Sequence, residues 1–440
     1  MNLIQAFGFT RNDCISFIGE EGKAAALFQI ARQYQCPVLV TATIDIGPEE
    51  IALAGYHVVL DDNNHLKDID PIHLMGIIMI TGPRTPDDMY RSPTLTELEE
   101  IYQYSLNNQI PLLIEADGSR RKPLKAHGDN ESVIPSFSTC MVNVVGLMCI
   151  GRPLGEEWVL RPEKFAEISG MVEGEMITSN SLVQVLGSKK GGLKKIMDPV
   201  MRYLILNQAD DTYLQSEAGK MADSLLPYYE KIGICQMNTD QQVIARKKPI
   251  AGIILAAGGA SRFGKAKQLN MWREKTYTEN VVIAAQLAGL SPIIVVTGYQ
   301  HESLKNVLKM YPVQTVFNPD WQKGQSTSMK VGLAHLGKRA QGALFLMADQ
   351  PQVSISLIRV IVEQSYLTDR QVIGPVIDGK RSTPMYFDRG VFPELMKVEG
   401  DQGGRSILSM YPPLLVEWFD TRMAMDIDFV TDINYLTTIE

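Results

Sequence analysis

The chain is poor in cysteine, has no long apolar run and carries no excess of positive charge. Its five cysteines are scattered without C-x-x-C spacing, which argues against a disulfide framework or a zinc site and predicts reduced, mostly buried thiols. No apolar run is long enough to cross a bilayer, and the first residues lack a signal-peptide pattern, so we expect a cytoplasmic protein. A formal net charge of -8 gives no electrostatic reason to expect nucleic acid as a partner.

Length and composition then bound the architecture. A chain of 440 residues exceeds the size of a single growing core, so two or three domains are expected. Residues 237–249 are polar, then basic, and end in proline, which makes them the best linker candidate. We therefore predict one domain over residues 1–240 and another over residues 249–440. The expected partners are small phosphorylated ligands, with Mg²⁺ balancing their charge.

The most informative stretch is residues 253–269, which read I-I-L-A-A-G-G-A-S-R-F-G-K-A-K-Q-L. It opens as a buried parallel strand, passes into a turn of small residues, and supplies Arg262 and Lys267 before helical periodicity resumes. Small residues such as Gly258 and Gly264 let backbone N–H groups approach a polyphosphate, and the two cations neutralise it. The pattern is neither a Walker A loop nor G-x-G-x-x-G. Phosphate binding is favoured over a turn with two solvated cations.

Two later segments are expected to join this loop. The apolar run 342–348 ends in Asp349, and an acid that a buried strand delivers to the carboxyl edge of an α/β sheet is well placed to bind Mg²⁺. A turn or helix cap is the alternative for this aspartate. The loop at 318–328 precedes a helix expected to start at Met329. Its serines, Ser326 to Ser328, are expected either to cap that helix or to form an anion site with its amides.

The first half alternates short apolar runs with helical stretches, the pattern of a parallel α/β domain. Strands are expected at residues 14–18, 37–41, 76–81 and 110–115. The turn G-E-E-G-K-A, residues 19–24, has the shape of a phosphate loop. However, Glu20 and Glu21 bring negative charge to it, and Ala24 lacks the hydroxyl that would bind Mg²⁺. Nucleotide binding and an inactive loop both stay open.

Two carboxylates, Glu115 and Asp117, follow the last of these strands, and four cations come within residues 120–125. Because α/β folds place their ligands at the carboxyl ends of strands, we favour a site here. The alternative is a solvated charge cluster in which the acids pair with Arg120 or Arg121.

The motif L-A-A-G-x-x-x-R-F-G-x-x-K-Q-L resembles the signature of nucleotidyltransferases that build pyrophosphate-linked dinucleotides, in particular the molybdenum cofactor cytidylyltransferases. The resemblance runs from about Pro249 onward and implies a Rossmann-like, GT-A-like α/β domain. It implies CTP as donor and a molybdopterin-type molybdenum cofactor as acceptor. It also implies Mg²⁺ held by Asp349, in A-D-Q-P, and by Asp428, in D-I-D-F-V-T-D.

Under this resemblance Arg262, Lys267 and Asp349 carry catalysis. The segment G-K-R-S-T-P at 379–384 departs from the family's G-x-x-G-H-P, so the role of that histidine is not transferred, whereas residues 399–406 match the family's G-D-x-G-x-R. The residues implied to bind the nucleotide and the second substrate are Leu255, Ala256, Ala257, Gly258, Gly264, Thr297, Gly298, Ser326, Asp401 and Arg405.

The first half resembles the YqeC-type selenium-dependent hydroxylase accessory proteins. The resemblance rests on E-A-D-G-x-R-R-x-P-L-K at 115–125, R-P-E at 161–163, G-G-L-K at 191–194 and N-Q-A-D at 207–210. It implies a P-loop-like parallel α/β domain and a molybdenum hydroxylase apoenzyme as partner. Two alternatives stay open for the whole chain: another small-molecule cytidylyl- or sugar-nucleotidyltransferase, and a cofactor carrier or maturation chaperone with the first half as its docking module.

Overall fold

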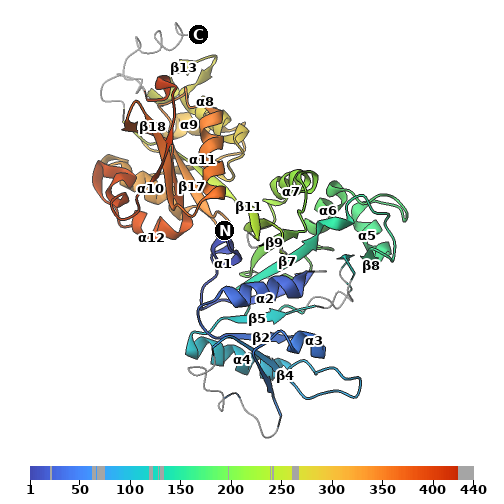
Figure 1. Cartoon of the computed structure of the whole chain (residues 1–440). Coiled ribbons are helices and arrows are strands. Elements are labelled where there is room, and N and C mark those ends of the chain that lie inside the picture. The colour runs from blue at the N-terminus through green and yellow to red at the C-terminus, as the bar shows by residue number, and fades with distance from the viewer. Residues whose placement is uncertain are drawn as a thin grey trace. The chain divides into compact units, whose positions relative to one another are not determined.

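A computed structural model describes residues 1–19, 22–61, 66, 75–117, 122–126, 128, 133–196, 198–237, 239, 242–259 and 267–424. The chain divides into two compact units, Met1–Lys247 (unit 1) and Lys248–Glu440 (unit 2), both visible in Figure 1. Each unit is a mainly parallel sheet with helices on both faces, so the predicted α/β class is confirmed. In the described ranges no helix is long and apolar enough to cross a membrane.

Unit 1 is built on a nine-stranded sheet of order β11-β10-β9-β7-β1-β5-β2-β4-β3, in which only β10 and β11 pair antiparallel. Its strands are β1 (Cys14–Gly19), β2 (Val38–Ala42), β3 (Tyr56–Val59), β4 (Ile77–Thr81), β5 (Leu112–Glu115), β7 (Cys140–Gly146), β9 (Met201–Asn207), β10 (Lys231–Cys235) and β11 (Val243–Lys247), and a separate pair is formed by β6 (Leu124–Lys125) and β8 (Val159–Leu160). Its helices are α1 (Leu3–Phe7), α2 (Lys23–Gln33), α3 (Pro48–Ile51), α4 (Leu95–Asn108), α5 (Pro162–Ser169), α6 (Ser179–Leu186) and α7 (Thr212–Leu225).

The strands of unit 1 are apolar on both sides because both faces of the sheet are covered. Every residue of β1 is buried. On one face Phe17 packs with residues of α2, and on the other Ile18 packs with residues of α5, α6 and α7. Continuous apolar runs of this kind are typical of parallel sheets. All five cysteines are buried and free, as predicted.

The predicted linker contains a strand instead. Residues 243–247 form β11, which pairs antiparallel with β10 at the edge of the unit 1 sheet. Their basic end, Arg246 and Lys247, suggested a solvated connection, but lysine and arginine are also common on edge strands because they discourage further pairing. The division between the units falls directly after this strand.

Unit 2 holds an eight-stranded sheet of order β16-β15-β12-β17-β20-β18-β19, with β21 added on β18. The strands are β12 (Ile250–Ala256), β15 (Ile293–Thr297), β16 (Gln314–Phe317), β17 (Gly342–Met347), β18 (Val372–Ile377), β19 (Lys380–Arg381), β20 (Met385–Asp388) and β21 (Leu414–Glu417), beside the small pair β13 (Met271–Trp272) and β14 (Lys275–Thr276). The helices are α8 (Tyr277–Leu287), α9 (His301–Leu308), α10 (Gln325–Ala334), α11 (Ile355–Leu367) and α12 (Phe392–Leu395).

Alternate residues of β12 divide the core of unit 2 between two layers. Ile254 packs with residues of α8, α9 and α11, whereas Ile253 and Leu255 pack with residues of α10 and α12. The strands β12, β15, β16 and β17 run parallel, and β20 runs antiparallel to β17. The carboxyl ends of the four parallel strands therefore meet at one edge.

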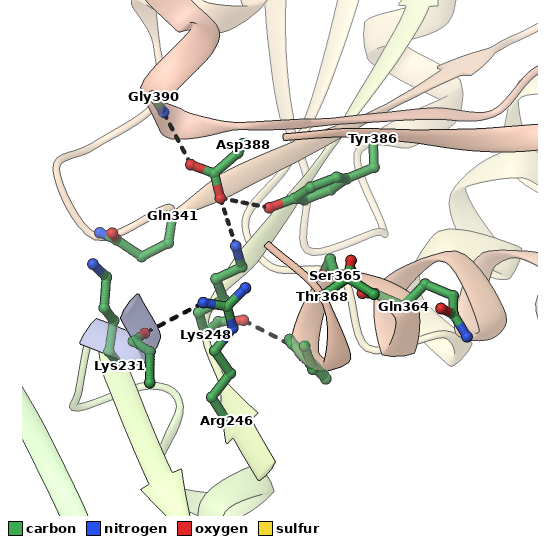
Figure 2. A network of polar contacts seen from close by, with 12 residues as sticks. Lys231, Arg246, Lys248, Gln341, Gln364, Ser365, Thr368, Tyr386, Asp388 and Gly390 are labelled. Carbon is green, nitrogen blue, oxygen red and sulfur yellow. Dashed lines mark hydrogen bonds and ion pairs between the residues drawn. The ribbon is translucent and has the colours of Figure 1, made fainter. Parts of the chain in front are cut away.

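A buried ion pair joins the start of unit 2 to its sheet (Figure 2). Lys248 is 6% exposed, and its Nζ lies 2.5 Å from Asp388 Oδ2 at the end of β20. Tyr386 Oη donates to the same oxygen at 3.0 Å, and the Gly390 amide donates to Oδ1 at 3.0 Å. Burial acts to raise the pKa of Asp388. The Lys248 charge and these hydrogen bonds outweigh burial and hold that pKa below its ordinary value of 3.8.

Replacing Asp388 with Asn is expected to make unit 2 less stable at neutral pH by about 1–3 kcal/mol, the range for hydrogen bonds to charged groups. Because the folded pKa is depressed, the wild-type advantage is complete above about pH 3.8 and is lost as pH falls through the folded pKa. Urea unfolding of both proteins at pH 7 and from pH 4.5 to 2.5 measures this. A difference that stays constant over that range would contradict it.

Candidate active site

Three strand ends meet where sequence analysis placed the site. Leu255 of β12 pairs with Val296 of β15 on one side and with Met347 of β17 on the other. β12 leads into Ala257, Gly258 and Gly259, β15 leads into Gly298, and β17 leads into Asp349. Ligands of open α/β sheets bind at such carboxyl ends. The structure thus brings the predicted residues 255–258, 297–298 and 349 to one edge.

The centre of this edge is an ion pair between Lys267 and Asp349. Lys267 Nζ lies 3.1 Å from Asp349 Oδ2, with side-chain exposures of 15% and 31%. Lys267 begins a short 3₁₀ helix, Lys267–Leu269, that follows the glycine-rich turn. The cation expected to bind phosphate and the acid expected to bind metal therefore face the same space. Arg262, Gly264 and Asp428, the other residues predicted for this centre, lie outside the described residues.

Gln268 connects the two ends of the glycine-rich turn. Its Nε2 donates to the Gly258 carbonyl at 2.8 Å, and its own carbonyl accepts from Thr278 Oγ1 of α8 at 3.0 Å. Gln268 is 8% exposed, and its Oε1 is buried with no hydrogen-bond partner among the residues that the structure describes. Sequence analysis gave this glutamine no role. The sequence K-Q-L alone does not show whether the glutamine side chain bonds to the turn or is solvated.

On the β15 side, Asn318 fixes the loop that leads to α10. Its amide N–H donates to the Thr297 carbonyl at 2.8 Å, and its side chain donates to Thr327 and Ser328 hydroxyls, both at 2.9 Å. Asn318 is 1% exposed. Through its backbone N–H and its side-chain amide, the buried Asn318 thus links the end of β15 to the first turn of α10.

The serines of this loop do not cap the helix, which corrects the sequence prediction. α10 begins at Gln325 with Gly324 as its N-cap, so Ser326 lies inside the helix and is 2% exposed. The Gln325 amide donates instead to Asp401 Oδ1 at 3.1 Å. Gly324 has a φ of 113°, and a Cβ there would lie 2.7 Å from Asp401 Oδ1. The cap comes from a residue 76 positions away, which no local pattern reveals.

A cavity of about 650 Å³ is lined by residues of β17, β19 and β20 among others, and Gln350, the residue after Asp349, also lines it. Its apolar lining consists of Leu255, Met329, Phe345, Met347, Met385, Phe387 and Leu408. Its polar and charged lining consists of Gln325, Gln350, Lys380, Arg381, Ser382, Thr383, Gln402 and Arg405, together with Gly404. Lys380, Arg381 and Arg405 are exposed, so three cations border a space that both apolar and uncharged polar side chains line. This lining suits a flat organic ligand that carries an anionic group.

Two segments that sequence analysis singled out border this cavity. Thr383, at the place of the family's histidine, has its Oγ1 2.5 Å from Gln350 Oε1 and so is bonded to the residue after Asp349. Lys380 and Arg381 follow a hairpin turn at Asp378 and Gly379, whose φ values are 49° and 69°. Two left-handed residues in sequence are typical of a tight hairpin, which projects the next residues outward.

Unit 1 carries a buried ion cluster at the carboxyl ends of β1 and β5. Lys23 Nζ lies 2.8 Å from Asp117 Oδ1 and 2.9 Å from Glu115 Oε1, and Lys125 Nζ also bonds Asp117. The Gly19 amide is 3.2 Å from both Asp117 oxygens. Burial acts to lower the pKa of Lys23, but the charges of Asp117 and Glu115 raise it above its ordinary value. None of the four charged residues is more than 8% exposed.

This cluster bears on the two interpretations of Glu115 and Asp117. The acids are buried rather than solvated, and among the described residues they pair with Lys23 and Lys125. Asp117 also uses a backbone N–H at the start of the predicted phosphate loop. Residues Glu20, Glu21, Arg120 and Arg121 lie outside the described residues.

Comparisons with known proteins give a separate match within each of the two units. Residues 252–414 match the family model described as MobA-like NTP transferase domain, and residues 15–163 match that described as YqeC protein. "Uncharacterized protein YqeC" of Escherichia coli (strain K12) is 34% identical over 109 residues, which are 24% of this chain and 43% of that protein. The chain thus spans less than half the length of that relative.

Unit 2 has relatives of its own. "Purine catabolism protein PucB" of Bacillus subtilis is 28% identical over 171 residues, 37% of this chain and 82% of that protein. A "Probable molybdenum cofactor guanylyltransferase" of Bacillus mycoides is 28% identical over 134 residues, 30% of this chain and 64% of that protein. The crystal structure of Rv0371c from Mycobacterium tuberculosis H37Rv is 27% identical, with a TM-score of 0.39 over 43% of this chain and 98% of that one. The chain therefore joins a YqeC segment, residues 15–163, to a MobA-like NTP transferase domain, residues 252–414.

Proposed function

We propose that unit 2 transfers CMP from CTP to the phosphate of a molybdopterin-type molybdenum cofactor and releases pyrophosphate. The observation that carries the proposal is the Lys267–Asp349 pair, 3.1 Å apart. Lys267 follows the glycine-rich turn after β12, and Asp349 precedes Gln350, which lines the 650 Å³ cavity. The turn suits the triphosphate, and the apolar cavity with its cationic border suits a pterin phosphate. The match to an NTP transferase domain supports the reaction class.

The proposed reaction exchanges one phosphoanhydride bond for another. An oxygen of the acceptor phosphate forms a bond to the α-phosphorus, and the bond from that phosphorus to the bridging oxygen breaks. The electron pair leaves with pyrophosphate. The nucleophile is already an anion, so no general base is required, and the described residues that line the cavity include no histidine. Catalysis is then positioning and charge neutralisation, in which Lys267 and, by proposal, Arg262 stabilise the charge on the α-phosphate and leaving group.

The residues present fit a magnesium ion. Mg²⁺ prefers hard oxygen ligands and, with nucleotides, takes one or two carboxylates beside phosphate oxygens and water. Asp349 offers such a carboxylate at the carboxyl end of β17, and Asp428 is proposed as the second. Bound Mg²⁺ would neutralise phosphate charge and orient the phosphates. Lys267 would then exchange its bond to Asp349 for one to the triphosphate.

The choice of nucleotide and the setting are finer proposals. L-A-A-G with R-F-G favours CTP by resemblance to the cytidylyl branch, whereas the relatives named above include guanylyltransferases. The similarity of unit 1 to YqeC supports a role in maturing a molybdenum hydroxylase, whose apoenzyme would receive the product in the cytoplasm. The alternative of a sugar nucleotidyltransferase is tested by the same assay with a sugar phosphate as acceptor in place of the molybdenum cofactor.

Pyrophosphate release by the purified full chain tests the proposal. The assay contains Mg²⁺, molybdenum cofactor and one of CTP, GTP, ATP or UTP. We expect release that requires the cofactor and is fastest with CTP. Release fastest with GTP would overturn the choice of CTP alone. Absence of release with every nucleotide, together with tight cofactor binding, would overturn transferase activity and favour a cofactor carrier.

A further inference from the structure

Sheet order separates the two sides of the site. The order β16-β15-β12-β17-β20-β18 places the phosphate turn after β12 and Asp349 after β17, next to it. The cavity lies toward β20 and β19, whose residues line it. If the cavity takes the acceptor, the remainder of the donor nucleotide has to extend toward β15 and β16. The side chains at those strand ends are therefore the candidates for contact with the nucleobase.

Several aromatic rings stand at that end of the sheet, among them Phe317, the last residue of β16, and two that lie beside the phosphate turn. Tyr299 follows Gly298 directly after β15 and is 58% exposed. Trp321 begins a short 3₁₀ helix in the loop that Asn318 anchors. Their ring centroids are 5.9 Å apart with the planes tilted by 58°. We call these residues the Tyr299–Trp321 pair.

The indole of Trp321 lies directly against the phosphate turn. A Cβ on Gly259 would lie 2.8 Å from Trp321 Cζ3, and a Cβ on Gly298 would lie 2.8 Å from Trp321 Cγ and 2.4 Å from the Ala257 carbonyl oxygen. These distances are shorter than side chains tolerate, so both positions require glycine. The backbone after β12, the backbone after β15 and the indole thus form one continuous surface, within one residue of Gly258.

We propose that the Tyr299–Trp321 pair is the stacking surface for the nucleobase of the donor nucleotide. This inference rests on the proposed function. Aromatic rings bind bases through the π face, which every base has, so stacking supplies affinity with little selectivity. The pair therefore strengthens binding of CTP and GTP by similar factors, and selection between them comes from other contacts. Trp321 and Tyr299 are positioning residues, because they touch the base and not the reacting phosphates.

Inorganic tripolyphosphate separates stacking from support of the loop, because it carries the phosphates without a base. We would titrate CTP, GTP and tripolyphosphate, each with Mg²⁺, into the full chain by calorimetry. Trp321→Leu is expected to weaken both nucleotides by about 5- to 150-fold, the range for one base stack of ~1–3 kcal/mol. Tripolyphosphate affinity is expected to stay within about 2-fold by the same reasoning, since it has no base to stack.

Further variants guard against a misfolded loop. Trp321→Phe keeps a ring and should retain most of the affinity, and Tyr299→Leu should lose less than Trp321→Leu because Tyr299 is largely exposed. Tyr213→Leu, which removes a 61% exposed ring from unit 1, is the matched control and should change nothing. In steady state Trp321→Leu should raise KM and leave kcat nearly unchanged.

The outcomes distinguish this inference from the proposed function. Equal weakening of nucleotides and tripolyphosphate by Trp321→Leu would show that the indole only supports the turn and would overturn the inference. Unchanged binding of all three ligands would also overturn it. Pair-dependent nucleotide binding without pyrophosphate release would support stacking and reject transfer. Failure of the wild-type chain to bind any nucleotide would overturn both.

Discussion

Asp349→Asn is expected to lower kcat for pyrophosphate release by about 10³-fold, equivalent to about 4 kcal/mol of transition-state stabilisation. The substitution keeps the size of the side chain but removes the charge that would hold Mg²⁺ and that pairs with Lys267 at 3.1 Å. Because Lys267 loses its carboxylate partner, CTP binding measured in EDTA is expected to hold or tighten. A variant that loses catalysis while keeping nucleotide affinity would locate the effect in the reaction itself.

The matched control for this experiment is Glu394→Gln in α12. Glu394 pairs with Lys397 at 2.8 Å on the surface of the same unit, and it lies outside the cavity lining. Its loss should leave kcat and KM unchanged, since exposed pairs contribute ~1 kcal/mol or less to stability and none to the site. Asp349→Asn activity within about 10-fold of wild type would be smaller than the loss of one charge-stabilising group normally causes and would refute the assignment.

Asp117→Ala is expected to destabilise unit 1 by about 3–5 kcal/mol, because it leaves two buried lysines beside one remaining acid. Lys23 and Lys125 both bond Asp117, and neither is more than 4% exposed. Hydrogen exchange of β1 and β5, measured on the full chain, should show lost protection there first. Urea unfolding gives the magnitude.

Two further variants sharpen this test. Glu167→Gln breaks the Lys190–Glu167 pair, whose side chains are 75% and 64% exposed, and should change stability by about 0.5 kcal/mol or less. Combining Asp117→Ala with Lys125→Met also removes a buried cation that bonds Asp117, and should recover part of the loss. Destabilisation by Asp117→Ala of under about 1 kcal/mol would show that the cluster is not the buried network described here.

Strand ends were the most predictable part of the molecule. Continuous apolar runs specify buried parallel strands, and the residue after each run must lie at the carboxyl edge of the sheet. This reasoning placed Asp349 and the turn at Gly258 together without any contact information, whereas Thr297 and Gly298 were predicted from the family resemblance. Their roles in binding and catalysis stay predictions.

Contacts between distant segments were not predictable. Lys23 and Asp117 are 94 positions apart and meet because β1 and β5 are neighbours, so the sequence alone did not reveal Lys23 as a partner of Asp117. The start of α10 was misplaced for the same reason, since its cap is Asp401. Trp321 lay within a loop that sequence analysis identified, but its contact with Gly259 and Gly298 depends on the folded arrangement of three connections.

The Lys267–Asp349 pair has a consequence for how the protein responds to single ions. Lys267 and Asp349 already form an ion pair. A divalent cation alone would have to displace Lys267 from the carboxylate, and a phosphate alone would have to displace Asp349 from the ammonium. A magnesium–nucleotide complex supplies both counter-charges at once, and binding of either component then raises the affinity for the other by the same factor. Under the proposed function, the pair would therefore make the binding of magnesium and of nucleotide depend on each other, and free phosphate or free magnesium alone would bind weakly.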